Sequence, residues 1–440
     1  MVMSKFRFYE FFAGAGLAKL GLGDPWRCVW ANDIDPQKAE IYRTNFGNDH
    51  FFLGDIAKFA ASDLPNSTQL AWASFPCQDL SLAGWRRGLS ADRSGTFWPF
   101  WQIMREQLHS GCRPPVIVIE NVVGLLYGDS FLGLCEALAA LGMQFGGMII
   151  DASRFLPQSR PRVFVVAIDA QLDCSAYITE QPVAAWSPIA LRQAHKKLPT
   201  DLKQLWRWWN LPIPAVKRPA IGHIIEERPT GVEWHTKTET DYLLSLMNPR
   251  NRKKVRDVQR MGGCHIGFIY KRMREGIQRA EVRFDGISGC LRTPRGGSSR
   301  QTVIIVNNSN VRSRLLSPRE AARLMGAPDT FELPPGYNHA YKAMGDAVAV
   351  PVVSWLSRNL LEPLATLACT SLQERQIHHS HATPLIERSE QRASEWLLQN
   401  HGTPPGGNKS LRLPNSKRKE NARTENDSST AHSAPILLND

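Results

Sequence analysis

Short apolar runs alternate with amphipathic stretches along the first 170 residues of the chain. Apolar runs of this length predict strands, and the stretches between them predict helices. The predicted strands cover 6–12, 28–31, 70–75, 116–120, 144–150 and 163–168, and the predicted helices end near 22, begin at Pro36, and cover 96–109 and 130–141. This order predicts an α/β fold with a doubly wound, mostly parallel sheet.

The pattern changes after residue 170. The chain there becomes irregular and rich in Pro, Trp and basic residues, which predicts a smaller second domain. Regular elements return where Ser317 and Glu320 have the spacing of a capping box, predicting a helix through Met325, and a last helix is predicted after Asp346. The final residues are mainly Ser, Asn, His, Lys, Glu and Pro, which predicts a disordered tail. The predicted parts are a first domain at 1–170, a second domain at 171–312, a segment at 313–365 that returns to the first domain, and the tail at 366–440.

Composition places the chain among soluble globular proteins. It has 440 residues, of which 42% are hydrophobic and 21% charged, and no apolar stretch is long enough to predict a membrane span. The N-terminus shows no signal peptide, and eight scattered cysteines suit a reducing cytoplasm and do not predict a metal site. The expected location is therefore the cytoplasm.

The net charge of +12 favours a polyanionic partner. Basic residues concentrate between 250 and 300, where acids are few. A solvated basic surface is the simpler interpretation, and contact with nucleic-acid phosphates is the one we favour.

Three consecutive segments, of which the first two are predicted strands, end in residues suited to an adenosyl group. The first is followed by the glycine turn Phe12-Ala13-Gly14-Ala15-Gly16, the second ends in Asn32-Asp33-Ile34-Asp35, and the third ends in Gly54-Asp55-Ile56. A glycine turn lets the backbone approach a ligand, and an acid at the next strand end is a usual partner of ribose hydroxyls. The glycine turn alone could be an ordinary tight turn, and no Walker lysine motif is present.

Three chemically active groups follow later strands. Cys77 comes just after the strand at 70–75, Glu120 closes the run 116–119, and Gln158-Ser159-Arg160-Pro161-Arg162 precedes a further strand. A lone cysteine is commonly an inert apolar residue, and a carboxyl group at a strand end can simply cap a loop. Because the ends of parallel strands meet at one crevice, we expect thiol, carboxyl and guanidinium groups to share a pocket.

These motifs in this order resemble the bacterial type of DNA (cytosine-5)-methyltransferase. The resemblance covers roughly 6–360 and excludes the tail. It continues with Arg292-Thr-Pro-Arg-Gly-Gly297, with Leu316 to Gly326, and with Gly345-Asp-Ala-Val348, where the family usually has Asn in place of Asp346.

The resemblance implies a reaction and roles for matching residues. Enzymes of this family transfer a methyl group from S-adenosylmethionine to carbon 5 of a cytosine that has left the duplex. Cys77 matches the nucleophile that adds to carbon 6. Glu120 matches the group that holds ring nitrogen 3 and the amine, and Arg162 with Arg160 matches the groups that hold the carbonyl oxygen. The matching cofactor-binding residues are Phe12, Ala13, Gly14, Gly16, Asp33, Ile34, Asp55, Ile56, Asp346 and Val348.

The resemblance also implies partners. Double-stranded DNA is the expected substrate, and a target-recognition region at about 171–290 is expected to read its sequence. A cognate restriction endonuclease is a further candidate partner. The enzyme is expected to be a monomer and to act at the bacterial nucleoid. An RNA cytosine methyltransferase is an alternative, since a branch acting on tRNA shares the motifs. A catalytically silent DNA-binding protein is another, but the intact Cys77, Glu120 and Arg162 disfavour it.

Overall fold

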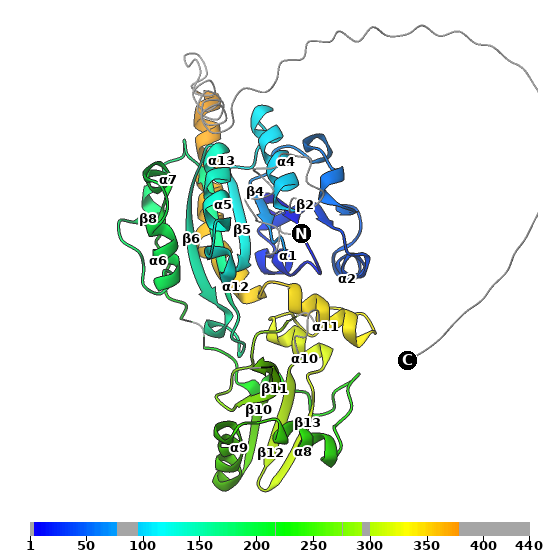
Figure 1. Cartoon of the computed structure of the whole chain (residues 1–440). Coiled ribbons are helices and arrows are strands. Elements are labelled where there is room, and N and C mark those ends of the chain that lie inside the picture. The colour runs from blue at the N-terminus through cyan, green and yellow to red at the C-terminus, as the bar shows by residue number, and fades with distance from the viewer. Residues whose placement is uncertain (1–3, 77–95, 216, 275, 293–299, 378–440) are drawn as a thin grey trace, which may run out of the picture. The chain divides into compact units, whose positions relative to one another are not determined.

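A computed structural model describes residues 4–76, 96–215, 217–274, 276–292 and 300–377. Its largest sheet has seven strands in the order β3-β2-β1-β4-β5-β7-β6 (Figure 1). β7 is antiparallel to both of its neighbours, and the other strand pairs are parallel. The strands are β1 (Phe6–Phe11), β2 (Trp26–Asp33), β3 (Phe51–Leu53), β4 (Leu70–Ala73), β5 (Val116–Val122), β6 (Met143–Asp151) and β7 (Pro161–Asp169).

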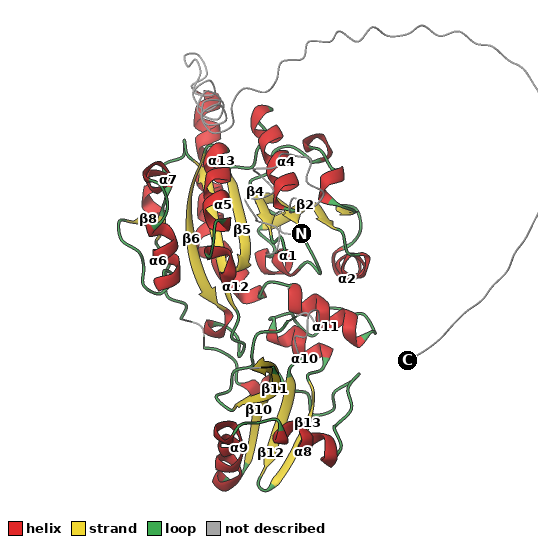
Figure 2. Ribbon diagram, viewed as in Figure 1, coloured by secondary structure: helices red, strands yellow, loops and turns green. Residues whose placement is uncertain are grey.

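Helices cover both faces of this sheet (Figure 2). One apolar cluster joins alternate strand residues such as Phe8 and Trp72 to helices that include α1, α2 and α12, and a second joins Phe11 and Ile119 to helices that include α4 and α5. Two buried faces explain why the strands read as continuous apolar runs. The helices are α1 (Leu17–Leu22), α2 (Pro36–Phe46), α4 (Phe97–His109), α5 (Ser130–Ala140), α6 (Ile189–Lys196) and α7 (Thr200–Leu205).

A second, antiparallel sheet has the strand order β11-β10-β12-β13. Its apolar face, which includes Ile269 and Val282, packs on α9 and on Met247. The sequence predicts irregular structure in this region. The sheet is hard to recognise from the sequence because basic residues interrupt the apolar alternation of its strands. Its elements are α8 (Lys237–Ser245), α9 (Pro249–Met261), β10 (Cys264–Arg274), β11 (Ile277–Arg283), β12 (Thr302–Asn307) and β13 (Asn310–Leu315). A two-stranded sheet, β8 (Ile178–Thr179) with β9 (Trp208–Trp209), lies between the two larger sheets in the sequence.

The chain then returns to the seven-stranded sheet. Ser317 caps α10 with the predicted capping box, in which Glu320 accepts the Ser317 N–H at 2.8 Å. The sequence did not predict α11, and α13 continues beyond residue 365 because Ala368 is buried against the core. The elements are α10 (Pro318–Leu324), α11 (Tyr337–Asp346), α12 (Val350–Leu356), a π-helix (Ser357–Leu361) and α13 (Glu362–Ile377).

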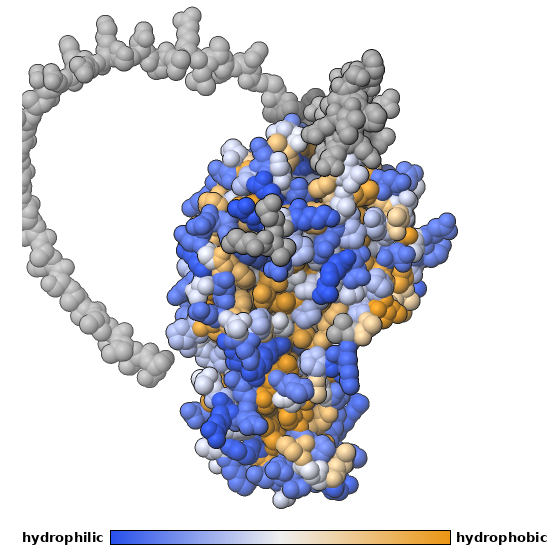
Figure 3. Space-filling model, turned by 180° about the vertical axis from the view of Figure 1, so that it is seen from behind, coloured by the Kyte–Doolittle hydropathy of each residue, from blue (hydrophilic) through white to orange (hydrophobic). Residues whose placement is uncertain are grey.

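The surface seen in Figure 3 is mostly hydrophilic, and its hydrophobic residues gather along the middle of that face. Gathered surface apolar residues are typical of a binding surface, whereas single ones are ordinary. No helix within the described ranges is long and apolar enough to cross a membrane.

Candidate active site

The carboxyl ends of β1, β2, β4 and β5 lie along one edge of the seven-stranded sheet. Ala73, the last residue of β4, pairs with Ile119, so Glu120 stands one step beyond the end of β4. Phe75 and Pro76 leave the sheet beside it and lead to Cys77. Cys77 itself lies in 77–95, outside the described residues.

Asn121 fixes the entry to the Cys77 segment. Its amide Nδ2 donates a hydrogen bond to the carbonyl oxygen of Phe75 at 3.0 Å, and both residues are buried. The Phe75 ring packs against Phe97 and Phe12, with ring centroids 5.2 and 6.3 Å apart. The segment therefore starts from a point held by β5, α4 and the end of β1. No sequence pattern marks Asn121 as a functional residue, although it stands beside Glu120 in the motif.

Glu120 and Arg162 form an ion pair at this edge. Arg162 Nε lies 3.2 Å from Glu120 Oε1, and their side chains are 14% and 8% exposed. Antiparallel pairing of β5 with β7 places Arg162 opposite Val122, two residues from the carboxylate. A buried carboxylate is costly unless it is paired, so the partner explains how Glu120 can close an apolar strand. The structure thus brings two of the predicted site residues together.

The hydrogen bonds of Arg160 run in another direction. Its guanidinium donates to the carbonyl oxygens of Leu291 at 3.0 Å, Gly345 at 2.9 Å and Ala347 at 2.5 Å. Burial, followed by the charge of Arg162, lowers the pKa of Arg160 to about 10. Arg160 therefore ties the start of β7 to two distant segments, one before β12 and one at the end of α11.

Gln158 makes a matching connection. Its Nε2 donates to the carbonyl oxygen of Leu324 at 2.7 Å, and its Oε1 accepts from the N–H of Leu291 at 3.1 Å. Because Gln158 is fully buried, leaving either group unpaired would be costly. One short motif thus carries two connecting side chains, on Gln158 and Arg160, and one, on Arg162, that faces the Glu120 carboxylate.

The predicted glycine turn follows β1 with three residues at positive φ. Phe12 has φ 57°, Gly14 58° and Gly16 80°. A bulky residue at positive φ is strained, and such strain gathers at ligand sites. A Cβ on Gly16 would come within 2.4 Å of the Phe46 ring, so only glycine lets α1 begin this close to α2.

Asp33 holds the turn in place. Its Oδ2 accepts the Gly14 N–H and its Oδ1 accepts the Asp35 N–H, both at 2.8 Å. The N–H of Ala13 also donates to the Asn32 carbonyl oxygen at 2.8 Å. The ends of β1 and β2 are therefore one connected unit, with the Asp33 carboxylate at its centre.

Apolar side chains border this unit. Ile34 is 66% exposed, and Ile56 is buried next to Asp55, whose carboxylate accepts the Ala57 N–H at 3.0 Å. Exposed apolar surface beside carboxylates and a glycine turn is the set of groups that an adenosine needs, since the base is flat and apolar and the ribose carries hydroxyls. Val348 is buried and stands two residues after Asp346 in the sequence. Asp346 pairs with Lys38 of α2.

A buried polar network lies beneath the turn. Glu10 of β1 accepts the Lys19 N–H at 3.1 Å and the Tyr42 hydroxyl at 3.3 Å, and Lys19 Nζ lies 2.8 Å from His50 Nε2. Burial raises the pKa of Glu10 to about 7. Burial, followed by the Lys19 ammonium, lowers the pKa of His50 to about 4. The start of α1 is thus held by a carboxyl group that titrates near neutral pH.

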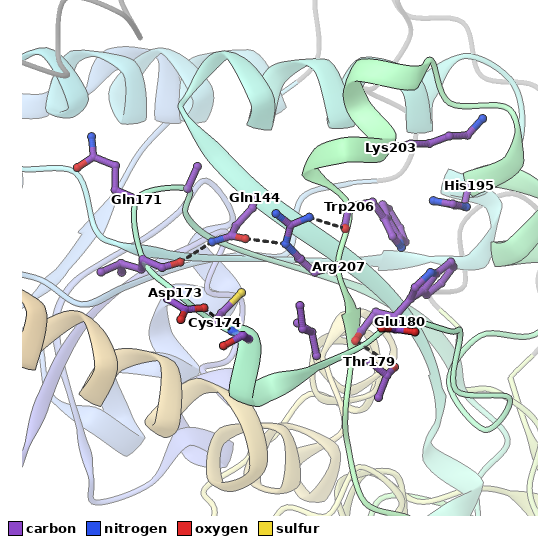
Figure 4. A pocket seen from close by; sticks show the side chains of 15 residues that line it. Gln144, Gln171, Asp173, Cys174, Thr179, Glu180, His195, Lys203, Trp206 and Arg207 are labelled. Carbon is purple, nitrogen blue, oxygen red and sulfur yellow. Dashed lines mark hydrogen bonds between the residues drawn. The ribbon is translucent and has the colours of Figure 1, made fainter.

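A cavity of about 670 Å³ lies near the start of β6 and the end of β7, at the opposite end of β5 from Glu120 (Figure 4). Gln144 at its wall accepts a hydrogen bond from Arg207 at 2.7 Å. Gln144 pairs with Ile168, which pairs with Val116 at the start of β5, whereas Glu120 lies near the end of that strand. The cavity is therefore separate from the site described above. Among the residues that line it are Cys174, His195, Lys203, Trp206 and Trp208.

The arrangement defines a doubly wound α/β enzyme with a polar site at its strand ends. The model of the C-5 cytosine-specific DNA methylase family matches residues 6–362. The chain belongs to this family, and it is a DNA (cytosine-5)-methyltransferase.

The chain is also similar to curated relatives in sequence and to solved structures in fold. The type II methyltransferase M1.ScrFI of Lactococcus lactis subsp. cremoris is 25% identical over 370 residues, covering 82% of this chain and 79% of that protein. The type II methyltransferase M.HhaI of Haemophilus parahaemolyticus is 26% identical over 359 residues, covering 80% and 94%. The S. pombe Dnmt2 methyltransferase and the Entamoeba histolytica methyltransferase EhMeth have TM-scores of 0.50 and 0.51 at 18% and 14% identity, each with 82% of this chain and 99% of the other covered. The structural likeness confirms the predicted fold class.

Proposed function

We propose that this enzyme methylates carbon 5 of cytosine within a specific double-stranded DNA sequence, through a covalent adduct between Cys77 and a base that has left the duplex. The observation that carries the proposal is the Glu120–Arg162 pair, 3.2 Å apart, beside the point where the chain enters the Cys77 segment. The glycine turn stands on the strand next to β4, so a nucleophile and a methyl donor can meet at this edge.

Each polar residue has a task in this reaction. Carbon 5 of cytosine is a poor nucleophile until the Cys77 thiolate adds to carbon 6 and moves the ring electrons toward carbon 5 and nitrogen 3. Glu120 holds nitrogen 3 and the exocyclic amine, where charge develops, and Arg162 holds the carbonyl oxygen. Carbon 5 then takes the methyl group from the sulfonium of S-adenosylmethionine, whose S–CH3 bond breaks to leave the thioether S-adenosylhomocysteine. Loss of the carbon 5 proton to a base then supplies the electron pair of the C5–C6 double bond, and the carbon–sulfur bond breaks to release the Cys77 thiolate. Arg160 acts as a positioning residue, since its donors are given to main-chain carbonyls.

The residues of the strand ends fit S-adenosylmethionine, which supplies an electrophilic methyl group on a sulfonium. Phe12 packs on the adenine, Asp33 binds the ribose hydroxyls, and Asp55 binds the adenine amine. Ile34 and Ile56 border the base. Ala13, Gly14 and Gly16 let the backbone approach the ligand, and the segment from Asp346 to Val348 closes the site.

The four-stranded sheet supports DNA as the substrate. Arg272 of β10 and Arg279 of β11 stand directly opposite each other, and both are exposed. Like charges in opposed positions destabilise a sheet unless an anion lies between them, and DNA phosphates are such anions. Since the curated relatives are named type II methyltransferases, we propose a role in restriction-modification. A partner endonuclease, the monomeric state, a location at the nucleoid and the division into domains at 170, 312 and 365 stay predictions.

A trapping experiment tests the proposal. Duplex DNA with 5-fluorocytosine at the target position has no carbon 5 proton to lose, so the adduct should persist on a denaturing gel after methyl transfer. We expect the adduct with wild type and none with Cys77→Ser, which should still bind S-adenosylhomocysteine. Glu120→Gln should lower kcat on ordinary DNA by about 10²–10⁴-fold.

Two outcomes would contradict the proposal. One is label from tritiated S-adenosylmethionine entering DNA at the wild-type rate with Cys77→Ser. The other is label entering RNA of the same sequence in preference to duplex DNA, which would favour the RNA methyltransferase instead.

A further inference from the structure

Two ion pairs join α2 to α11 beside the glycine turn. Lys38 Nζ lies 2.8 Å from Asp346 Oδ2, and Lys342 pairs with Asp35, the residue that caps α2. The Lys38 side chain lies along the turn, since a Cβ on Gly14 would be 3.9 Å from its Cδ. The first pair therefore stands at the turn itself.

The Lys38–Asp346 pair is set among acids. Burial acts to lower the pKa of Lys38, but the carboxylates of Asp346 and Asp33 outweigh it and raise that pKa, so Lys38 stays cationic. The Lys38 and Asp346 side chains are 18% and 32% exposed, so the pair is only partly shielded from solvent. A partly exposed ion pair contributes little to stability, and a role in binding accounts better for its place at the turn.

Lys38 and Asp346 match the two charges of an amino acid. The methionyl end of S-adenosylmethionine carries a carboxylate and an α-ammonium group. We propose that Lys38 binds this carboxylate and Asp346 binds the α-ammonium, so that the pair recognises the zwitterionic end of the methyl donor. The inference rests on the proposed function and deepens it, because it names the groups that distinguish the donor from other adenosine compounds.

The charge of Asp346 gives a reason for Lys38. An acid there, near Asp33, would crowd negative charge at the turn unless a cation lay between them. Lys38 supplies that cation, and we infer that the two positions work as a unit.

Calorimetry with two ligands tests the inference. S-adenosylhomocysteine has the amino-acid end, and 5′-methylthioadenosine lacks it. Lys38→Met should weaken binding of S-adenosylhomocysteine by about 10–100-fold, the range expected for a charge-assisted hydrogen bond, and leave 5′-methylthioadenosine within about twofold. Lys38→Arg should restore most of the loss because it keeps the positive charge.

Lys342→Met is the matched control. It removes the other ion pair between the same two helices, so it should leave the ratio of the two affinities unchanged. Asp346→Ala should weaken S-adenosylhomocysteine more than its deaminated analogue.

The outcomes separate this inference from the proposed function. If Lys38→Met weakens both ligands equally, or if Lys342→Met changes the ratio of the two affinities as much as Lys38→Met does, the ion pair only connects the two helices. Either result would contradict this inference but not the proposed function. A wild-type protein that binds neither ligand would overturn the proposed function as well.

Discussion

Charged side chains are buried and paired at the edge of the seven-stranded sheet, whereas they are exposed on the surface of the four-stranded sheet. At the edge, Glu120 and Arg162 are nearly buried and paired, and both Nη atoms of Arg160 donate to main-chain carbonyls. On the smaller sheet, Arg272 and Arg279 are exposed and face each other. Chemistry needs groups held in one geometry, which burial and pairing provide, whereas recognition of a polyanion needs cations left open to it.

The largest expected effect concerns the junction of the two regions. Arg314 of β13 and Glu320 of α10 form a fully buried ion pair with two short contacts, Nη1–Oε2 at 2.8 Å and Nη2–Oε1 at 2.6 Å. Glu320→Ala leaves the buried Arg314 guanidinium without a carboxylate partner and removes the acceptor of the Ser317 N–H, so we expect a loss of about 3–5 kcal/mol in the free energy of unfolding. Denaturant titration measures it.

An exposed ion pair between Arg323 of α10 and Asp329, which follows that helix, gives the control. Arg323 and Asp329 lie 2.7 Å apart with side chains 25% and 61% exposed, and Asp329→Asn should cost at most about 1 kcal/mol. Equal losses for the two variants would mean that burial does not distinguish the junction from the surface.

The second prediction assigns pH sensitivity to the larger region. The folded protein holds the pKa of Glu10 at about 7, above its ordinary value of 4.5, so the folded state keeps a proton that the unfolded chain releases. The contribution of Glu10 to stability therefore falls as the pH rises from about 4.5 to about 7, by about 3 kcal/mol in total. Glu10→Gln cannot titrate, so the difference in unfolding free energy between wild type and Glu10→Gln should fall over this range. A difference that stays constant from pH 4.5 to 7 would contradict the prediction.

The smallest effect belongs to the exposed cations. Arg279→Gln should weaken DNA binding and reduce the salt dependence of log K by about one unit of slope, because one phosphate contact is lost. Arg274 is the matched control, since Glu281 already lies 3.0 Å from it, and Arg274→Gln should change the slope less. Fluorescence anisotropy at several salt concentrations measures the slope of log K against log salt for each variant. Equal slopes for wild type and Arg279→Gln would contradict the proposal that DNA binds this surface.

Residues that act locally could be predicted from the sequence. The Ser317–Glu320 capping box forms as expected, because its hydrogen bonds join neighbours along the chain. Six of the seven strands of the larger sheet were predicted, because both faces of the sheet are buried and each of these strands reads as an apolar run. The short edge strand β3 was not predicted as a strand, and two of its three residues are exposed. The smaller sheet was missed because its apolar face is completed by distant residues such as Met247, while its other face carries arginines.

The sequence by itself determined the fold class and the family, and it singled out Glu120 and Arg162, which the structure pairs. Only the tertiary structure decided what neighbouring motif residues do. Arg160 and Arg162 are two positions apart, but Arg160 precedes β7 and turns to Leu291 and Gly345, whereas Arg162 lies within β7 and faces Glu120. The Asn121–Phe75 bond and the Lys38–Asp346 pair likewise join segments far apart in the chain. Local patterns fix elements, because their hydrogen bonds and burial repeat along the chain, but the partner of a side chain is fixed by which segments the folded core brings together.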